Sequence, residues 1–256
     1  MKMGCSSTKI HLGGTARGPE DVIALHELGL QFAEIPITAP EKFLALKEDY
    51  QGLKEQLGLY YLCHGPREGE PNDIEALEIF YLPKVMKILS IMPELDMKVL
   101  TLHLWMDPRF VQEDSISKKI RLLNTIITSA SDLGITICLE NLSESASHLA
   151  HIFDALPLLN LTLDLGHAEL LTKQNTSVRF MRRYPEKIRH IHLHDNRGGD
   201  SPDDDLHLPV GEGIIDFEKI FRELRAMDYH GTICLELPPQ GIRKCLGHVK
   251  QLLEYN

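Results

Sequence analysis

The chain has 256 residues, of which 43% are hydrophobic and 25% charged, a balance that fits a globular protein and excludes the disordered and fibrous classes. Its 27 lysines and arginines against 37 aspartates and glutamates give a formal net charge of −10, which disfavours nucleic acid and acidic membrane surfaces as partners. Five scattered cysteines without a CxxC pair, and the lack of an apolar run long enough for a signal peptide or a membrane span, favour a reducing cytoplasm.

Short apolar runs rich in branched residues alternate with longer stretches of helical period along the whole chain. This alternation is typical of repeated βα units around a parallel sheet. Eight runs are predicted to be strands, at residues 9–12, 32–37, 59–64, 99–104, 135–141, 161–165, 188–194 and 232–237.

The stretches between these runs carry helix signals. Asn72 and Glu75 have the spacing of a capping pair ahead of a helix that Pro83 is expected to kink. Asp216 is predicted to cap a later helix.

Eight βα units in 256 residues leave 32 residues for each unit, which suits a closed barrel. No linker, low-complexity tract or shift in composition divides the chain. We therefore predict an α/β protein with a single (β/α)8 TIM barrel domain over residues 1–256. The stretch 196–215 is rich in glycine, proline and aspartate and follows the seventh strand, so it is predicted to be a functional loop.

The carboxyl ends of the strands are where a parallel barrel collects its functional groups. The chain has 13 histidines, and the third to eighth predicted strands all end in a potential metal ligand. These residues are His64, His103, Glu140, Asp164 with His167, His192 with His194, and Glu236.

Carboxylates at the ends of buried strands need compensation, because an unpaired buried charge is costly. The same strand ends contain no basic residue, so a cation is the natural compensation. Glu140, Asp164, His192 and Glu236 would form an oxygen-rich site with one nitrogen, suited to Mn²⁺, Mg²⁺, Co²⁺ or Zn²⁺. Each residue alone could be an ordinary hydrogen-bonded group, and it is their repeated placement that favours a metal site.

Alternation places His190, His192 and His194 on one face of the seventh strand. His192 is the predicted ligand, because His190 lies too early in the strand and His194 already borders the loop. A neighbouring histidine is expected to support the ligand or to bind substrate. His11 is a further candidate for the pocket. The other histidines are predicted to lie at the surface: His26, His148, His151, His230 and His248.

These motifs resemble the xylose isomerase-like TIM barrel superfamily, which holds sugar and sugar-phosphate isomerases and epimerases together with endonuclease IV. The resemblance covers nearly the whole chain. It is carried by LEN at 139–141, LDLGHA at 163–168, HIHLHDN at 190–196, HLPVGEGIIDF at 207–217 and LELP at 235–238.

The resemblance implies roles for individual residues. The metal-binding residues of the sugar epimerases match Glu140, Asp164, His192 and Glu236, and in those enzymes both glutamates also move protons. A histidine that contacts substrate there matches His167. Endonuclease IV holds three zinc ions, and all of its ligands have a match in this chain. The additional ones are His64, His103, His167, Asp205 and His207.

Two departures count against DNA cleavage. The loop after the second strand, IPITAP, lacks the basic and aromatic residues that would grip phosphates and stack on bases. The net charge of −10 also disfavours binding to DNA. The segment AEIPI at 33–37 instead resembles the second strand of the isomerase branch.

The first hypothesis is therefore a divalent-metal-dependent isomerase or epimerase of a small sugar, sugar phosphate or related polyol ketone. Glu140 and Glu236 would exchange a proton on opposite faces of a metal-stabilised enediolate. His64, His167 and Arg197 are candidate substrate contacts.

The alternative is an endonuclease IV-like, zinc-dependent phosphodiester hydrolase, an AP endonuclease, in which His64, His103, Asp205 and His207 all bind metal. A lyase or dehydratase could use the same site, and a binding protein without turnover is disfavoured because both glutamates are present.

No nucleotide cofactor is expected, because GEG at 211–213 lacks the spacing of a P-loop or a dinucleotide fingerprint. The expected partner is a small carbohydrate-like substrate, not a membrane, and a homo-oligomer is compatible with the sequence.

Overall fold

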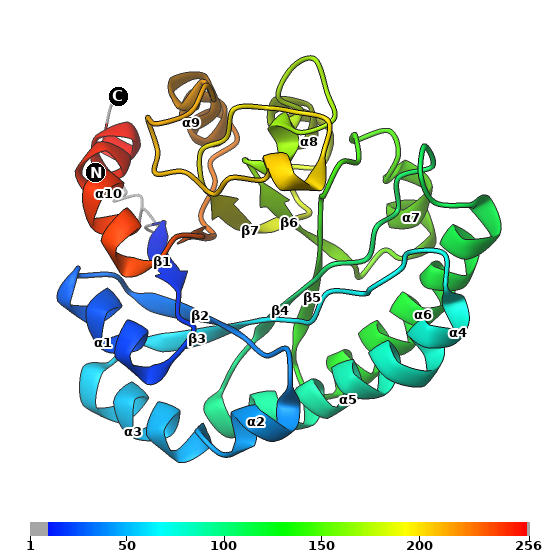
Figure 1. The fold of residues 1–256 in the computed structure, drawn as a ribbon, viewed down its shortest axis with the longest axis horizontal. Helices are drawn as coiled ribbons and strands as arrows, with labels where there is room; N and C mark the ends of the chain where they lie inside the picture. Colours follow the sequence, from blue (N-terminus) through cyan, green and yellow to red (C-terminus); the bar gives the residue numbers. More distant parts are fainter. Residues whose placement is uncertain (1–9, 255–256) are drawn as a thin grey trace, which may run out of the picture.

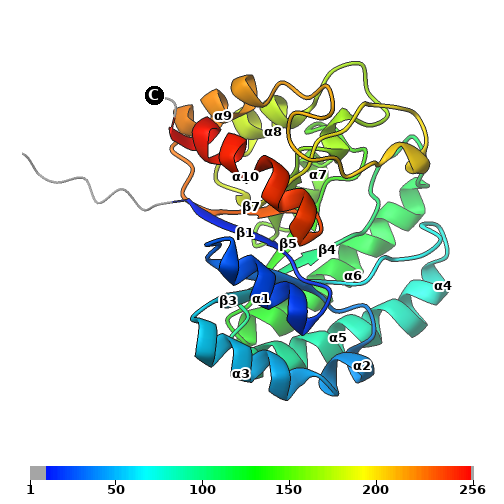
Figure 2. The same cartoon turned by 60° about the vertical axis from the view of Figure 1, so that its left-hand side comes forward.

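Eight parallel strands close into one barrel in a computed structural model that describes residues 10–254. Each strand pairs with the next along the chain, and β8 pairs with β1. Figures 1 and 2 show the helices around the outside of the barrel. The predicted α/β class and (β/α)8 barrel are confirmed. The strands are β1 (His11–Thr15), β2 (Phe32–Pro36), β3 (Tyr60–His64), β4 (Val99–Leu102), β5 (Thr136–Glu140), β6 (Asn160–Asp164), β7 (Ile188–Leu193) and β8 (Thr232–Leu235).

The helices follow the strands in sequence and cover the outside of the barrel. Among the described residues, none of them is both long enough and apolar enough to cross a membrane. They are α1 (Pro19–Glu27), α2 (Pro40–Leu44), α3 (Lys47–Leu57), α4 (Ile74–Ala76), the π-helix η1 (Leu77–Tyr81), α5 (Leu82–Ile91), the 3₁₀-helix η2 (Met92–Leu95), α6 (Glu113–Asp132), α7 (Ala150–Ala155), the 3₁₀-helix η3 (His167–Glu169), α8 (Ser177–Arg183), the 3₁₀-helix η4 (Pro202–Asp204), α9 (Phe217–Ala226) and α10 (Pro239–Glu254).

Alternation along the strands separates an apolar outer layer from a more polar interior. In β6 and β7, Leu163 and Ile191 belong to the large hydrophobic core that the helices complete. Thr162 has the opposite orientation, and its hydroxyl lies 2.8 Å from that of Thr101 in β4. By the same alternation, Asp164 in β6 and His192 in β7 face the interior, so polar side chains continue along the inside of the barrel to its carboxyl end.

The first strand begins later than predicted. Residues 9–12 were expected to form it, but β1 covers His11–Thr15, and Lys9 lies outside the described residues. The sequence signal is weak here because Gly13 and Gly14 lack apolar side chains. Gly13 is needed nevertheless, since a Cβ atom at this position would overlap the Phe32 ring inside the barrel.

The capping prediction at Asn72 is wrong by one residue. Asp73 caps α4, accepting a hydrogen bond from the Ala76 N–H at 3.0 Å, whereas the Asn72 side chain accepts from the Gln112 N–H at 3.0 Å. The helix irregularity expected at Pro83 takes the form of the π-turn η1, which ends just before it, because proline has no N–H to continue the helical ladder. Asp216 caps α9 as predicted.

Candidate functional site

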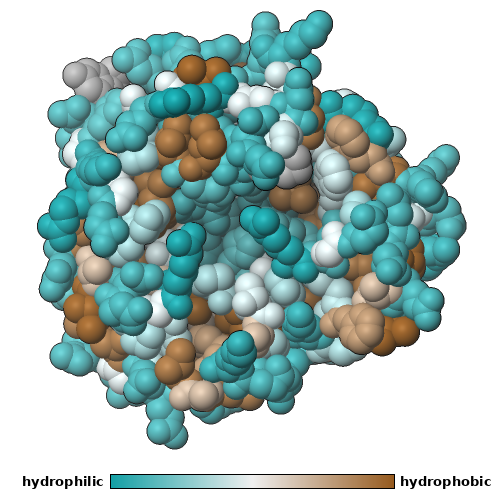
Figure 3. Space-filling view, viewed as in Figure 1, coloured by the Kyte–Doolittle hydropathy of each residue, from teal (hydrophilic) through white to brown (hydrophobic). Residues whose placement is uncertain are grey.

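The four predicted ligands meet at the carboxyl end of the barrel. Glu140 and Asp164 are the last residues of β5 and β6, His192 lies in β7, and Glu236 follows β8 directly. One side-chain ligand atom of each lies within 4.8 Å of those of the other three. Figure 3, viewed as in Figure 1, shows this face hollowed at its centre, with mostly hydrophilic residues in the hollow.

His192 lies at the centre of this four-residue group. Its Nδ1 atom is 3.2 Å from Glu140 Oε1, 3.5 Å from Glu236 Oε1 and 3.7 Å from Asp164 Oδ2. The side chains of His192, Glu140 and Asp164 are fully buried, and that of Glu236 is 13% exposed. Three carboxylates therefore converge on one imidazole nitrogen, with Glu236 nearest to solvent.

The donor set suits a divalent cation. Among the described residues, Glu140 Oε1 and His192 Nδ1 are buried without a hydrogen bond of good geometry, which native proteins rarely leave unexplained. Three carboxylates and one imidazole are the oxygen-rich ligand set preferred by Mn²⁺, Mg²⁺ and related ions. Burial lowers the pKa of His192, but Glu236, Glu34 and Glu140 outweigh burial and raise that pKa well above its ordinary value, so this pocket strongly favours positive charge.

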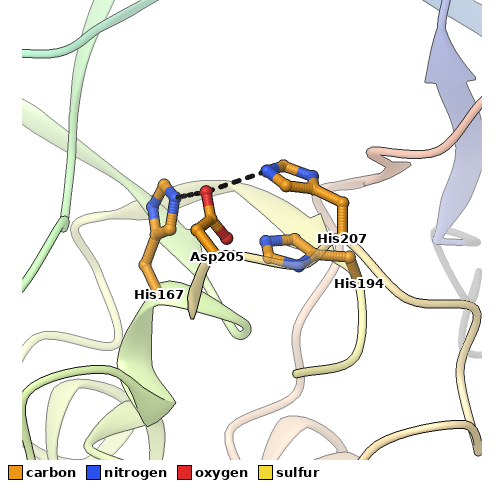
Figure 4. A group of neighbouring side chains, drawn as sticks. All are labelled: His167, His194, Asp205 and His207. Atoms are coloured by element: carbon orange, nitrogen blue, oxygen red, sulfur yellow. Dashed lines mark hydrogen bonds and ion pairs between the residues drawn. The ribbon is translucent and has the colours of Figure 1, made fainter. Parts of the chain in front are cut away.

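A second group surrounds Asp205 (Figure 4) and contacts the first, since His167 Nδ1 lies 3.2 Å from Glu140 Oε1 and His194 Nε2 lies 3.2 Å from Asp164 Oδ1. His167 Nε2 and His207 Nε2 lie 3.2 Å and 3.0 Å from Asp205 Oδ2. The rings of His194 and His207 stack with their centroids 3.9 Å apart. All four side chains offer ligand atoms within 4.8 Å of one another, so this second group could also hold an ion.

The loop after β7 supplies Asp205 and His207, and buried Asp195 anchors it. The Asp195 carboxylate accepts hydrogen bonds from the N–H groups of Gly211 and Gly213, both at 2.9 Å. His207 has a backbone φ of 45°, which is uncommon for a residue other than glycine and typical of functional sites. The loop predicted to be functional is therefore held in a defined path beside the four-residue group.

Two further histidines contact Glu140 from the other side. His103 Nε2 lies 2.7 Å and His64 Nε2 3.3 Å from Glu140 Oε2. Together they form a third set of possible ligands, so Glu140 belongs to two sets at once. Burial alone would raise the pKa of Glu140, but His103 and His192 hold it well below its ordinary value. Glu140 is therefore a carboxylate at physiological pH.

Other predictions about single residues need correction. His11 is the first residue of β1, at the amino end of the strand and away from the hollow, where its Nδ1 lies 2.8 Å from the Tyr60 hydroxyl. The role of Arg197 as a substrate contact stays a prediction: the residue is exposed on the loop, and its guanidinium lies 3.5 Å from the Glu212 carbonyl. His148 is only partly exposed, with Nδ1 3.5 Å from Asp107. Among residues 10–254, the exposed histidines are His11 and, as predicted, His26, His151, His230 and His248.

Two residues contribute more to the site than predicted. His194 was passed over as the ligand because it borders the loop, yet its Nε2 lies 3.2 Å from Asp164 and its ring stacks on His207. Glu34 in β2 was not considered as a functional residue, although a carboxylate inside an apolar strand is itself a signal. Its side chain is buried and contacts both His190 and His192.

Metal-free protein should lose stability as the pH rises from about 6.5 to about 9. Burial lowers the pKa of His64 and His207, but hydrogen bonds to Glu140 and Asp205 outweigh it and raise both to about 9. A histidine whose pKa is higher when folded contributes stability that is complete below its unfolded pKa of about 6.5 and disappears as the pH rises through about 9.

A bound cation should weaken this dependence, because its positive charge beside Glu140 and Glu236 disfavours protonation of the neighbouring His64 and His207. The difference in Tm between metal-loaded and chelator-treated protein should therefore widen across this pH range. Thermal unfolding of both forms at three pH values measures it, and a constant or narrowing difference contradicts the prediction.

Comparison with known proteins shows that most of this chain matches a single family of TIM barrels. Residues 22–252 match the family described as xylose isomerase-like TIM barrel. The uncharacterized protein MJ1311 of Methanocaldococcus jannaschii is 31% identical over an alignment of 179 residues, which covers 63% of this chain and 57% of the length of MJ1311.

Solved structures with the same fold include a D-tagatose 3-epimerase-like protein, with a TM-score of 0.79 and 23% identity over 96% of this chain and 97% of that one. Another is the 3-keto-D-glucoside 4-epimerase YcjR from E. coli, with a TM-score of 0.75 and 18% identity over 95% of this chain and 100% of that one. At identities of 23% and 18%, the similarity to these two structures shows that the fold is shared and no more.

Proposed function

The chain belongs to the xylose isomerase-like TIM barrel family, and on this premise we propose that it is a divalent-metal-dependent epimerase or isomerase of a small ketose or related polyol ketone. The observation that carries the proposal is the convergence of Glu140, Asp164 and Glu236 on His192 Nδ1. The solved structures named for epimerases, with a D-tagatose 3-epimerase-like protein and a keto-D-glucoside epimerase among them, support a carbohydrate substrate.

Glu140, Asp164, His192 and Glu236 would hold the ion. When bound, a divalent cation there supplies positive charge that lowers the cost of an enediolate. The buried position of Glu140 excludes water from one side of the centre, while Glu236 is partly exposed toward the hollow. The site therefore offers two carboxylates in different surroundings to one bound substrate.

The two glutamates belong to β5 and β8, which are separated around the barrel by β6 and β7. One of them would take the proton from the carbon next to the carbonyl, and the electron pair of the broken C–H bond would move to the carbonyl oxygen. The other would return a proton to the opposite face of the planar intermediate, which inverts that carbon without net oxidation or reduction. His167, 3.2 Å from Asp205, remains the candidate that orients a substrate hydroxyl.

The direct test is incubation of protein loaded with Mn²⁺, Co²⁺, Zn²⁺ or Mg²⁺ with ketoses such as D-tagatose, D-fructose and D-allulose in D₂O. Proton NMR should report a second epimer together with deuterium at the inverted carbon. Chelator-treated protein is the control and should give neither signal. Loaded protein that leaves every ketose and keto-glycoside unexchanged contradicts the proposal.

A zinc-dependent phosphodiester hydrolase is the second candidate. It is favoured by one observation, the overlap of several candidate ligand sets among the described residues, two of which share Glu140. It is disfavoured by the segment between β2 and α2, residues 37–39, which contains no basic or aromatic side chain for DNA. Elemental analysis with anomalous scattering separates the two candidates: one ion per chain contradicts the hydrolase, and three zinc ions contradict the single-metal epimerase.

A further inference from the structure

Beneath the four-residue group, the interior of the barrel contains a buried carboxylate that the proposed reaction does not use. We propose that Glu34 is a positioning residue, which holds the His192 ring so that Nδ1 points into the metal centre and thereby sets the affinity of that centre for its ion. The inference rests on the proposed function, because it concerns the same metal centre.

The two nitrogens of His192 have separate surroundings. Nε2 lies 3.0 Å from Glu34 Oε2, whereas Nδ1 is directed at Glu140, Asp164 and Glu236. A neutral imidazole carries hydrogen on only one nitrogen. A carboxylate at Nε2 favours the hydrogen there, which leaves the lone pair of Nδ1 for an ion. Such a carboxylate on the far side of a ligating histidine typically orients the ring and raises its basicity.

Glu34 is itself held in one place. Its other oxygen, Oε1, lies 3.3 Å from His190 Nε2, and His190 Nδ1 lies 2.6 Å from the Thr232 hydroxyl. Glu34 and His190 are buried, and they belong to strands on different sides of the barrel, β2 and β7. A chain of contacts from Thr232 through His190 and Glu34 therefore ends on His192, supported by rigid strands and not by a loop.

Packing alone does not explain a carboxylate at this position. The neighbouring interior residues Phe32, Leu62 and Cys234 form a small apolar cluster, and an apolar side chain would fill the same space. A buried carboxylate is costly unless it is paired. Among residues 10–254, the ion pairs of Glu34 are those with His190 and His192, although neither of its oxygens has a hydrogen bond of good geometry in the structure. The Cys234 thiol also lies beside this carboxylate, so its neighbours are the metal-facing histidine, a second histidine and a thiol.

Two variants of Glu34 test whether this residue acts by positioning the His192 ring or only through its negative charge. Glu34→Gln keeps the size of the side chain and removes its charge, while Glu34→Asp keeps the charge and shortens the side chain, so that the contact with His192 Nε2 is lost. The control is Thr162→Val, which removes another buried polar group of the barrel interior, the 2.8 Å contact with Thr101. Circular dichroism of the three variants checks that each is folded.

The measurement is the affinity of chelator-stripped protein for Co²⁺, obtained by competition with a chromophoric chelator, together with the visible spectrum of the Co²⁺ form. Both Glu34 variants should bind the ion roughly 10- to 100-fold more weakly than the wild type, with shifted absorption bands. Thr162→Val should match the wild type in affinity and spectrum. The spectrum matters because a merely structural weakening would leave the ligand geometry of the bound ion unchanged.

Each other outcome has a definite meaning. Wild-type affinity and spectrum in both Glu34 variants overturn the inference, and so does a wild-type result for Glu34→Asp alone, since charge without positioning would then suffice. Wild-type protein that binds Co²⁺ but does not epimerise any ketose contradicts the proposed function and leaves the inference standing. Wild-type protein that takes up no ion contradicts both.

Discussion

Replacing Glu140 by glutamine is expected to lower the epimerisation rate by a factor of about 10³ or more, because this residue would serve as both proton carrier and ligand. Loss of a general acid or base alone typically costs about 10²- to 10⁴-fold. Glu140 Oε1 lies 3.2 Å from His192 Nδ1, and Oε2 lies 2.7 Å from His103 Nε2. Glutamine preserves the shape and removes the negative charge from all of these contacts.

The matched control is Glu144→Gln, in the loop that follows β5. Glu144 is also buried, but it accepts hydrogen bonds from the backbone N–H groups of Met106 and Leu142. Rates at saturating metal and the affinity for metal should be measured for both variants. The Glu144 variant should retain activity, and a Glu140 variant with near-normal turnover at saturating metal would show that Glu140 carries no proton.

Replacing Glu236 by glutamine is expected to reduce epimerisation by a similar factor of about 10²–10⁴, but to leave a partial reaction. If the two glutamates serve opposite faces of one intermediate, the variant still has Glu140 to remove and return a proton on its own face. One epimer of a substrate pair should therefore exchange its C–H hydrogen with D₂O, while the other should not. The wild type should exchange both.

Proton NMR of each pure epimer, incubated with the metal-saturated variant in D₂O, measures this asymmetry. Metal saturation is needed because Glu236 Oε1 lies 3.5 Å from His192 Nδ1 within the proposed ligand set. Exchange of both epimers at equal rates in the variant would instead mean that a single base serves both faces. Loss of exchange from both epimers, with metal still bound, would mean that Glu236 takes part in both directions.

The sequence alone was sufficient for the barrel and for the position of its four central side chains. Alternation, helix signals and the rule that function collects at the carboxyl ends of parallel strands are local or topological properties. They were enough to single out Glu140, Asp164 and Glu236, which end or directly follow β5, β6 and β8. The roles of these residues as ligands and proton carriers remain predictions.

Two predictions fell short for different physical reasons. His11 was placed in the pocket because the two glycines after it hid the rest of β1, which continues to Thr15. His194 was passed over as the ligand because it borders the loop, and β7 does end just before it, at Leu193. The stacking of its ring on His207 depends on the path of that loop, which the sequence pattern does not contain.

Contacts across the barrel and along the long loop were decided by tertiary structure. The meeting of Glu34 with His192 depends on the closure of eight strands, which brings β2 and β7 within reach of each other through the interior. The approach of His207 to Asp205 and His194 depends on a loop path that Asp195 anchors through backbone hydrogen bonds. Periodicity in a sequence indicates which face a residue occupies, whereas distances between faces exist only once the barrel is closed.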